Sequence, residues 1–164
     1  MLQKSQRAIG HEEESPERES EAYEEYLLLG KIDLKKILFV CVENAGRSQM
    51  AEAFANRYGR GKVSASSAGI KLAERVNPTV TQALREKGID ISMNRPKLLT
   101  AKMSEEADLI VTMGCGAADL CPGPFFKTTV DWGLEDPKGK PIEKVREIRD
   151  EIERKVKKLV DEAT

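Results

Sequence analysis

Short runs of apolar residues along the chain predict four β-strands. The segments KILFVCV (36–42) and ADLIVTM (107–113) are apolar almost throughout, as expected of strands that are buried on both faces. KVSASSAG (62–69) predicts a short strand that leads into a loop, and FKTTVDW (126–132) predicts a further strand.

Between these runs, apolar residues recur at helical spacing. Met50, Phe54 and Tyr58 are four residues apart, which predicts a helix over 46–59. NPTVTQALREKG (77–88) has an asparagine at the capping position, a proline in the first turn and a glycine at its close, so we expect a second helix there. The clearest helix is the last one, in which a single apolar stripe comprises Ile142, Val145, Ile148, Ile152, Val156 and Leu159.

Strands that alternate with helices in this way predict an α/β fold, with a parallel sheet and helices on both of its faces. Ligands of such sheets bind beyond the carboxyl ends of the strands. Cys41 lies at the end of the first predicted strand, and Cys115 follows two residues after the strand that ends at Met113. We therefore expect the two cysteines to open onto the same edge of the sheet.

The chain divides into a charged N-terminal extension, 1–34, and a domain over 35–164. We expect residues 1–14 to be disordered. SPERESEAYEEYLLLG (15–30) predicts an appended helix over about 15–29, because serine and proline suit its start and glycine suits its end. An apolar face on this helix would pack against the domain or against a neighbouring subunit, which would make the protein a homo-oligomer; disorder is the alternative.

Composition narrows the class of protein. The chain is 40% apolar and 34% charged, and its formal net charge is −1. It has no apolar run long enough to span a membrane and none of the features of a signal peptide, so we expect a cytoplasmic protein without membrane contact. Acidic residues concentrate in 1–30 and leave the remainder mildly basic. That charge suits a small anionic ligand, and the absence of a basic stripe argues against nucleic acid.

The count of cysteines and histidines limits the chemistry further. Three cysteines are an odd number, which favours buried, catalytic or redox-active thiols over a disulfide framework. There is no C-x2-C pair and His11 is the single histidine, so we expect no metal site and no cofactor. Any nucleophilic chemistry in the domain needs a proton donor other than histidine, which points to a carboxylate.

The segment CVENAGRS (41–48), between a buried strand and an amphipathic helix, predicts a loop that binds an oxyanion. Such a loop points several backbone N–H groups inward, and the N-terminus of the helix adds the positive end of its dipole. The expected backbone donors are Val42, Glu43, Asn44, Ala45, Gly46 and Arg47.

The side chains of this segment have separate expected roles. Gly46 permits a backbone conformation that a larger residue would resist. Arg47 offers a planar fork that matches two oxyanion oxygens. Cys41 beneath these donors would be largely thiolate, and Ser48 could donate a hydrogen bond to it. In the alternative interpretation, Cys41 merely ends a strand and Arg47 is solvated, because C-x5-R-S alone is short; its position between strand and helix favours the loop.

VCVENAGRSQMAEAF (40–54), followed by SSAG (66–69), resembles the family that low-molecular-weight protein tyrosine phosphatases share with thioredoxin-coupled arsenate reductases. The resemblance extends from about Lys35 to the end of the chain. RSQMAE, VTMGCGAADLCPG (111–123) and DWGLEDPKGK (131–140) resemble the arsenate reductase branch. The resemblance implies a flavodoxin-like four-stranded parallel sheet, with the oxyanion loop at its edge.

The same resemblance implies roles for individual residues. Cys41 corresponds to the nucleophile, Arg47 holds the oxyanion, Ser48 stabilises the thiolate, and Asp136 corresponds to the general acid. From the residues alone, Asp136 is hard to separate from Asp131 and Glu135 as the candidate proton donor.

Two further thiols separate a reductase from a phosphatase. In the implied relay, Cys41 attacks arsenate and Cys115 then attacks the adduct, which releases arsenite and leaves a Cys41–Cys115 disulfide. Cys121 next attacks Cys115, and thioredoxin or a similar thiol reductant reduces the resulting pair. In a continuous helix the two Cα atoms would lie about 9 Å apart along the axis, whereas a disulfide tolerates about 4.4 to 6.8 Å. We therefore expect 114–123 to be mobile, as a loop or a helix that unwinds; two buried core cysteines are the alternative.

Three functions remain. The first is an arsenate reductase acting on arsenate. The second is a low-molecular-weight phosphatase that hydrolyses phosphotyrosine or small phosphate monoesters through a phosphocysteine at Cys41; no aromatic pair follows Asp136–Pro137 to stack a tyrosine ring. The third is a redox or anion sensor whose N-terminal helix engages a partner.

The chain also departs from the family pattern. VENAG replaces the threonine, glycine and second cysteine of many relatives, which leaves the contact of Glu43 with substrate open. Some members bind potassium near the positions of Asn44 and Glu52. Lys97 falls where such a site would need an acid, and its ammonium group could replace the ion, so we predict no dependence on potassium.

Overall fold

The computed structural model describes residues 34–114 and 129–163. Strands and helices alternate along this part of the chain, as the sequence predicts. The predicted N-terminal helix over about 15–29 and the segment with Cys115 and Cys121 lie outside the described residues.

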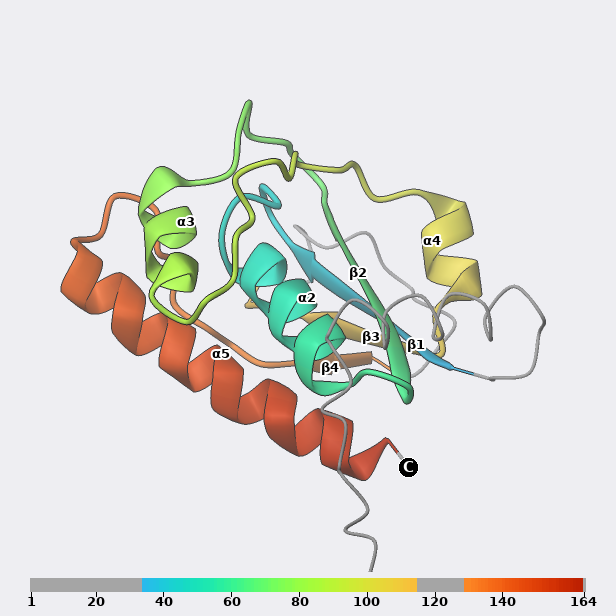
Figure 1. The fold of residues 1–164 in the computed structure, drawn as a ribbon. Coiled ribbons are helices and arrows are strands. Elements are labelled where there is room, and N and C mark those ends of the chain that lie inside the picture. Colours follow the sequence, from blue (N-terminus) through green and yellow to red (C-terminus); the bar gives the residue numbers. More distant parts are fainter. Residues whose placement is uncertain (1–33, 115–128, 164) are drawn as a thin grey trace, which may run out of the picture. The chain divides into compact units, whose positions relative to one another are not determined.

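The sheet has four strands, which are all parallel and have the order β2-β1-β3-β4 (Figure 1). The strand β1 (Lys35–Cys41) lies in the middle, because Leu38 pairs with Ser66 on one side and with Ile110 on the other. The other strands are β2 (Val63–Gly69), β3 (Leu109–Thr112) and β4 (Thr129–Asp131). The predicted four-stranded parallel sheet is confirmed.

Helices cover both faces of this sheet. The helices α2 (Arg47–Tyr58), α3 (Pro78–Arg85) and α5 (Ile142–Glu162) share one face (Figure 1). The main core lies beneath them and contains Phe39 from β1. A smaller core on the opposite face includes Leu38 and packs against α4 (Ala101–Glu106).

Two of these helices form for reasons that are visible in the sequence. The Asn77 side chain accepts a hydrogen bond from the N–H of Thr79 at 2.9 Å, and Pro78 occupies the first turn, which confirms the predicted start of α3. Along α5, the predicted apolar stripe is buried at four of its six positions. Its end residues Ile142 and Leu159 are partly buried.

The helix α4 was not predicted. It has only six residues, and none of them is buried, so it lacks an apolar period. Its one local signal is Thr100, whose hydroxyl accepts a hydrogen bond from the N–H of Met103 at 3.2 Å.

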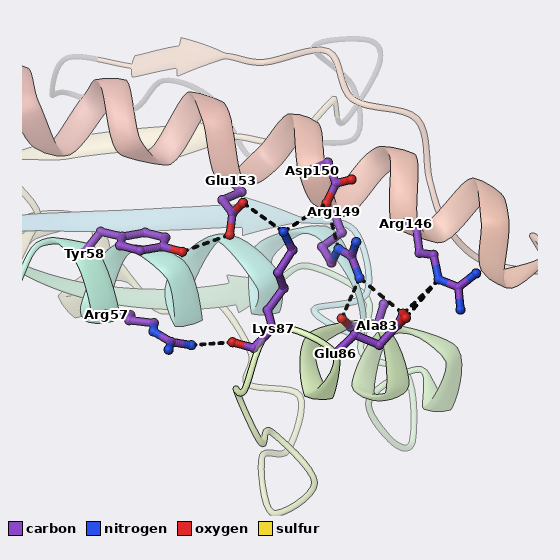
Figure 2. Close-up of polar contacts among 9 residues, drawn as sticks. All are labelled: Arg57, Tyr58, Ala83, Glu86, Lys87, Arg146, Arg149, Asp150 and Glu153. Carbon is purple, nitrogen blue, oxygen red and sulfur yellow. Dashed lines mark hydrogen bonds and ion pairs between the residues drawn. The ribbon is translucent and has the colours of Figure 1, made fainter.

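Ion pairs and hydrogen bonds tie α2, α3 and α5 together (Figure 2). Arg149 is buried within the apolar stripe of α5, and its Nη1 donates to the carbonyl of Ala83 at 2.9 Å and to Glu86 at 3.3 Å. Glu153 of α5 accepts a hydrogen bond from the Tyr58 hydroxyl of α2 at 2.9 Å. Within the part of the chain described, no helix is long and apolar enough to cross a membrane.

Candidate active site

The carboxyl end of β1 carries Cys41, which is buried, and the chain then turns through residues 42–46 into α2. This loop lies directly on the end of β2. A Cβ atom added to Gly69 would come within 2.8 Å of the backbone nitrogen of Asn44, so the loop could not occupy its place if residue 69 had a side chain. This close approach explains the glycine of the SSAG segment.

The carbonyl groups of the loop point away from Cys41. The Val42 carbonyl accepts hydrogen bonds from Ile70 and Lys71, both at 2.9 Å, and the Ala45 carbonyl accepts one from Asn77 at 2.8 Å. Among the described residues, no backbone hydrogen bond has an N–H of 43–46 as its donor. With the carbonyls engaged in this way, these N–H groups remain available to an anion over Cys41, and their binding of an oxyanion stays a prediction.

Asn44 sets the shape of the loop. Its φ is 52°, in the left-handed region that asparagine tolerates better than most residues. The fully buried side chain accepts hydrogen bonds from the N–H of Lys97 at 2.8 Å and from the amide of Gln49 at 3.0 Å. It also donates to the Ser48 hydroxyl at 2.7 Å.

Gly46 is not a left-handed residue, since its φ is −142°. What the structure shows instead is a need for space, because a Cβ atom there would come within 2.8 Å of the ring of Pro137. The oxyanion loop therefore packs against the segment that carries the predicted acid.

Ser48 contacts Cys41 as predicted, with Oγ 2.8 Å from Sγ. Because the Ser48 oxygen already accepts a hydrogen bond from Asn44, its own proton can be directed to the sulfur. All three side chains are buried, so the serine can stabilise a negative charge on Cys41 without competition from water.

Arg47, the first residue of α2, is also buried. Its Nη1 donates to the carbonyls of Met113 at 2.8 Å and Leu134 at 3.0 Å, with a longer contact to Gly114 at 3.4 Å. These bonds fix one edge of the guanidinium. The Nε–Nη2 edge makes none of them, and it is the edge that could meet two oxyanion oxygens.

Asp136 lies on the segment that packs against the oxyanion loop. Its Oδ2 is 3.6 Å from Nη2 of Arg47, and its Oδ1 accepts a hydrogen bond from the N–H of Lys138 at 3.0 Å. Half of the side chain is exposed. Asp136 and Cys41 line one cavity of about 360 Å³, together with Arg47.

The structure separates Asp136 from the two acids that the sequence could not exclude. Asp131 accepts hydrogen bonds from the Thr112 hydroxyl at 3.0 Å and the N–H of Gly114 at 2.8 Å, so it holds backbone in place. Glu135 pairs with Lys144 at 3.1 Å, and this hydrogen bond lowers the pKa of its carboxyl. Of the three acids, Asp136 lines the cavity and the other two do not.

The side chain of Glu43 points to a partner that the sequence did not reveal. Its Oε1 is 2.8 Å from Nζ of Lys138, and both residues line the cavity. The hydrogen bond that the Lys138 ammonium group donates to Glu43, and to a smaller extent the charge of Asp136, raise the pKa of this group.

Lys97 contacts Glu52, one of the residues near which some members of the family are expected to bind potassium. Its Nζ lies 3.2 Å and 3.4 Å from the two carboxylate oxygens of Glu52, and Glu52 also accepts a hydrogen bond from the Ser67 hydroxyl. A lysine ammonium thus supplies a positive charge next to Glu52, and independence from potassium stays a prediction. Within 34–114 and 129–163, no three His, Cys, Asp or Glu side chains gather as a metal site would require.

Sequence reasoning missed three contributors: Gln49, Asp131 and Lys138. Each has a partner that is distant in the sequence, namely Asn94 for Gln49, Gly114 for Asp131 and Glu43 for Lys138, and nothing in the local pattern marks these contacts. Of the six predicted catalytic residues, Cys41, Arg47, Ser48 and Asp136 come together around one cavity or directly beneath it. Cys115 and Cys121 lie outside the described residues.

Comparison with known proteins shows the family to which the chain belongs. The family model of the low molecular weight phosphotyrosine protein phosphatase matches residues 36–164. An arsenate reductase of Brevibacillus brevis is 40% identical over 128 residues, which cover 77% of this chain and 95% of the relative. A solved arsenate reductase in the phosphate binding state is 34% identical with a TM-score of 0.72, over 80% of this chain and all of that one. An arginine phosphatase from Geobacillus stearothermophilus is 30% identical with a TM-score of 0.70, over 78% and 92% of the two chains.

Proposed function

The chain belongs to the low molecular weight phosphotyrosine protein phosphatase family, and from that premise we propose that it is an arsenate reductase. The observation that carries the proposal is the Cys41–Ser48 contact of 2.8 Å beneath a loop with outward-facing carbonyls. A thiolate stabilised in this way is a strong nucleophile towards a bound tetraoxo anion.

In the first step, the Cys41 sulfur attacks the arsenic atom of arsenate. A sulfur–arsenic bond forms and an arsenic–oxygen bond breaks, while Asp136 donates the proton with which the departing oxygen leaves as water. The inward N–H groups and the Nε–Nη2 edge of Arg47 hold the remaining oxygens and balance the charge that develops on them.

In the second step, the thiolate of Cys115 attacks the Cys41 sulfur. The sulfur–arsenic bond breaks, its electron pair stays on arsenic, and arsenic(V) leaves as arsenite, arsenic(III). A Cys41–Cys115 disulfide results. The Cys121 thiolate then attacks Cys115 and frees Cys41, and an external dithiol such as thioredoxin reduces the Cys115–Cys121 disulfide.

We place this reaction in the cytoplasm, where thiols are kept reduced and a thiol reductant is available. The substrate is a free tetraoxo anion, arsenate, with phosphate as a competing ligand. Homo-oligomerisation through the N-terminal helix remains a separate prediction.

Phosphatase activity is the second candidate, and the size of the cavity favours it. About 360 Å³ is within the range of pockets that take small organic ligands, so an ester could enter. Hydrolysis would need Cys41, Arg47 and Asp136 but neither of the other cysteines. The solved relative from Geobacillus stearothermophilus, an arginine phosphatase, uses the same fold.

The separating experiment measures arsenate-dependent oxidation of a thioredoxin system by the wild type and by Cys115→Ser and Cys121→Ser. We expect both variants to lose arsenate reduction while they keep p-nitrophenyl phosphate cleavage, which serves as the control for an intact loop. Unchanged reduction kinetics in either variant would contradict the relay. A wild type that cleaves the ester but reduces no arsenate would favour the phosphatase.

A further inference from the structure

Glu43 and Lys138 join two neighbouring loops that both line the cavity. Glu43 belongs to the oxyanion loop, and Lys138 follows the acid Asp136 by two residues. Their side chains meet at 2.8 Å, and both residues line the cavity with Cys41. The Glu43 side chain is 28% exposed and that of Lys138 is 68% exposed, so the pair lies at the mouth and not at the floor.

Lys138 connects this pair to the acid through its backbone. Its N–H donates to Oδ1 of Asp136 at 3.0 Å, while its side chain reaches Glu43. One residue therefore ties the acid to the oxyanion loop. Any displacement of the 136–138 segment away from that loop must break the ion pair.

The cavity is larger than a tetraoxo anion needs. A phosphate or arsenate ester would place its organic group outside the oxyanion loop, where the mouth lies. A side-chain bridge at the mouth leaves less room for this group, so we expect an ester to enter but to bind less tightly than the free anion.

We propose that the Glu43–Lys138 bridge is a specificity-determining element that favours a free tetraoxo anion over an ester of the same anion. The proposal deepens the proposed function and rests on it, because a free oxyanion is the substrate of an arsenate reductase. It assigns to Glu43 a role in excluding esters, in addition to the expected role of its backbone N–H.

The pair also controls the charge at the mouth. An unpaired Glu43 carboxylate would repel a dianion, and an unpaired Lys138 ammonium would attract one. As a pair their charges cancel. Replacing one partner therefore changes the affinity for any anion, and this effect must be separated from the obstruction.

The effect of charge is separated from the effect of obstruction by comparing two ligands of similar charge. The dissociation constants of inorganic phosphate and phenylphosphonate, which cannot be hydrolysed, are measured by isothermal titration calorimetry. The proteins are the wild type, Glu43→Ala, Lys138→Ala and the double variant. Charge acts on both ligands alike, so it cancels in the ratio of the phenylphosphonate constant to the phosphate constant.

We expect that ratio to fall by at least about threefold in all three variants, because the phenyl group gains room in each. Phosphate alone should bind more tightly to Glu43→Ala, more weakly to Lys138→Ala and about as tightly to the double variant as to the wild type. A ratio that stays at the wild-type value in the double variant would overturn the proposal, whether or not the phosphate constants move.

Lys140→Ala is the matched control. Lys140 lies on the same segment and pairs with Glu135 at 3.5 Å, but it does not line the cavity. Both constants should keep their wild-type values in it, and a fallen ratio there would also contradict the proposal. Neither ligand requires Cys115 or Cys121, so failure of the bridge is distinguishable from failure of arsenate reduction, which is measured separately on the wild type.

Discussion

Arg47 depends on backbone that is held by a residue outside the cavity. Its Nη1 donates to the carbonyls of Met113 and Leu134. Asp131 accepts hydrogen bonds from Gly114, next to Met113, and more weakly from Gly133, next to Leu134, at 2.8 and 3.4 Å. Gly114 has a φ of 88° and no room for a Cβ atom beside Leu134, so this junction permits little adjustment. Asp131 is thus a positioning residue for the arginine.

Replacement of Asp131 tests this role. Asp131→Ala removes the acceptor, and we expect phosphate to bind about three- to tenfold more weakly, the loss of about one hydrogen bond. Asp131→Asn keeps an acceptor oxygen and should bind phosphate nearly as the wild type does. Calorimetry measures both.

The same measurement in an Arg47→Ala background gives the control. Asp131→Ala should then have no further effect on phosphate binding, because the group that it positions is gone. An undiminished effect in that background would show that Asp131 does not act through Arg47.

The side chain of Lys97 bears on whether turnover depends on potassium. Its ammonium group lies 3.2 Å from Glu52, where we predict that it takes the place of a bound cation. We therefore expect the same arsenate turnover in potassium and sodium salts at equal ionic strength. A rise in turnover with potassium but not with sodium would contradict this assignment.

Among the elements, α5 shows what a periodic pattern can and cannot predict. The pattern placed the helix and its apolar face, because burial repeats with the helical period. It could not predict that Arg149 is buried in the same stripe. The groups that accept its hydrogen bonds, the carbonyl of Ala83 and the carboxylate of Glu86, belong to another part of the chain. The helix α4 could not be predicted from a periodic pattern, because it has only six residues and none of them is buried.

The hydrogen bonds between Arg146 of α5 and Glu86, at the end of α3, should make the free energy of unfolding depend on pH (Figure 2). Hydrogen bonds from Nε of Arg146, at 2.9 and 3.0 Å, lower the pKa of Glu86 from its ordinary value of 4.5. Because the pKa of Glu86 is lower in the folded state than in the unfolded state, its ionised carboxylate stabilises the fold above pH 4.5. This contribution is lost as the pH falls through the folded-state pKa.

We therefore expect the wild type to exceed Glu86→Gln in free energy of unfolding at neutral pH, and the difference to shrink as the pH falls below 4.5. Urea denaturation at a series of pH values measures it. The matched control is Glu151→Gln, at an exposed position of α5, whose difference from the wild type should vary less with pH. A Glu86→Gln difference that is constant with pH would contradict the prediction.

For the whole molecule, the sequence was sufficient to predict the four-stranded parallel sheet, and the four described residues with predicted catalytic roles lie together in the structure, while those roles stay predictions. The loop is contiguous, and the carboxyl ends of parallel strands must meet, so Cys41 and the end of β3 were expected at one edge. The bridge between Glu43 and Lys138 spans 95 residues, and the contact of Asn94 with Gln49 spans 45. Such contacts depend on the packing of loops, which no local period encodes.

The central claim is that arsenate oxidises this protein through its own thiols, and a count of free thiols after one turnover tests it most directly. Reduced protein is mixed with arsenate without a reductant, and thiols, disulfide positions and arsenite are measured by mass spectrometry and arsenic speciation. We expect one arsenite for each chain, a Cys115–Cys121 disulfide with Cys41 free, and a trapped Cys41–Cys115 disulfide in Cys121→Ser. Arsenite formed with all three thiols still free, or no arsenite at all, would contradict it.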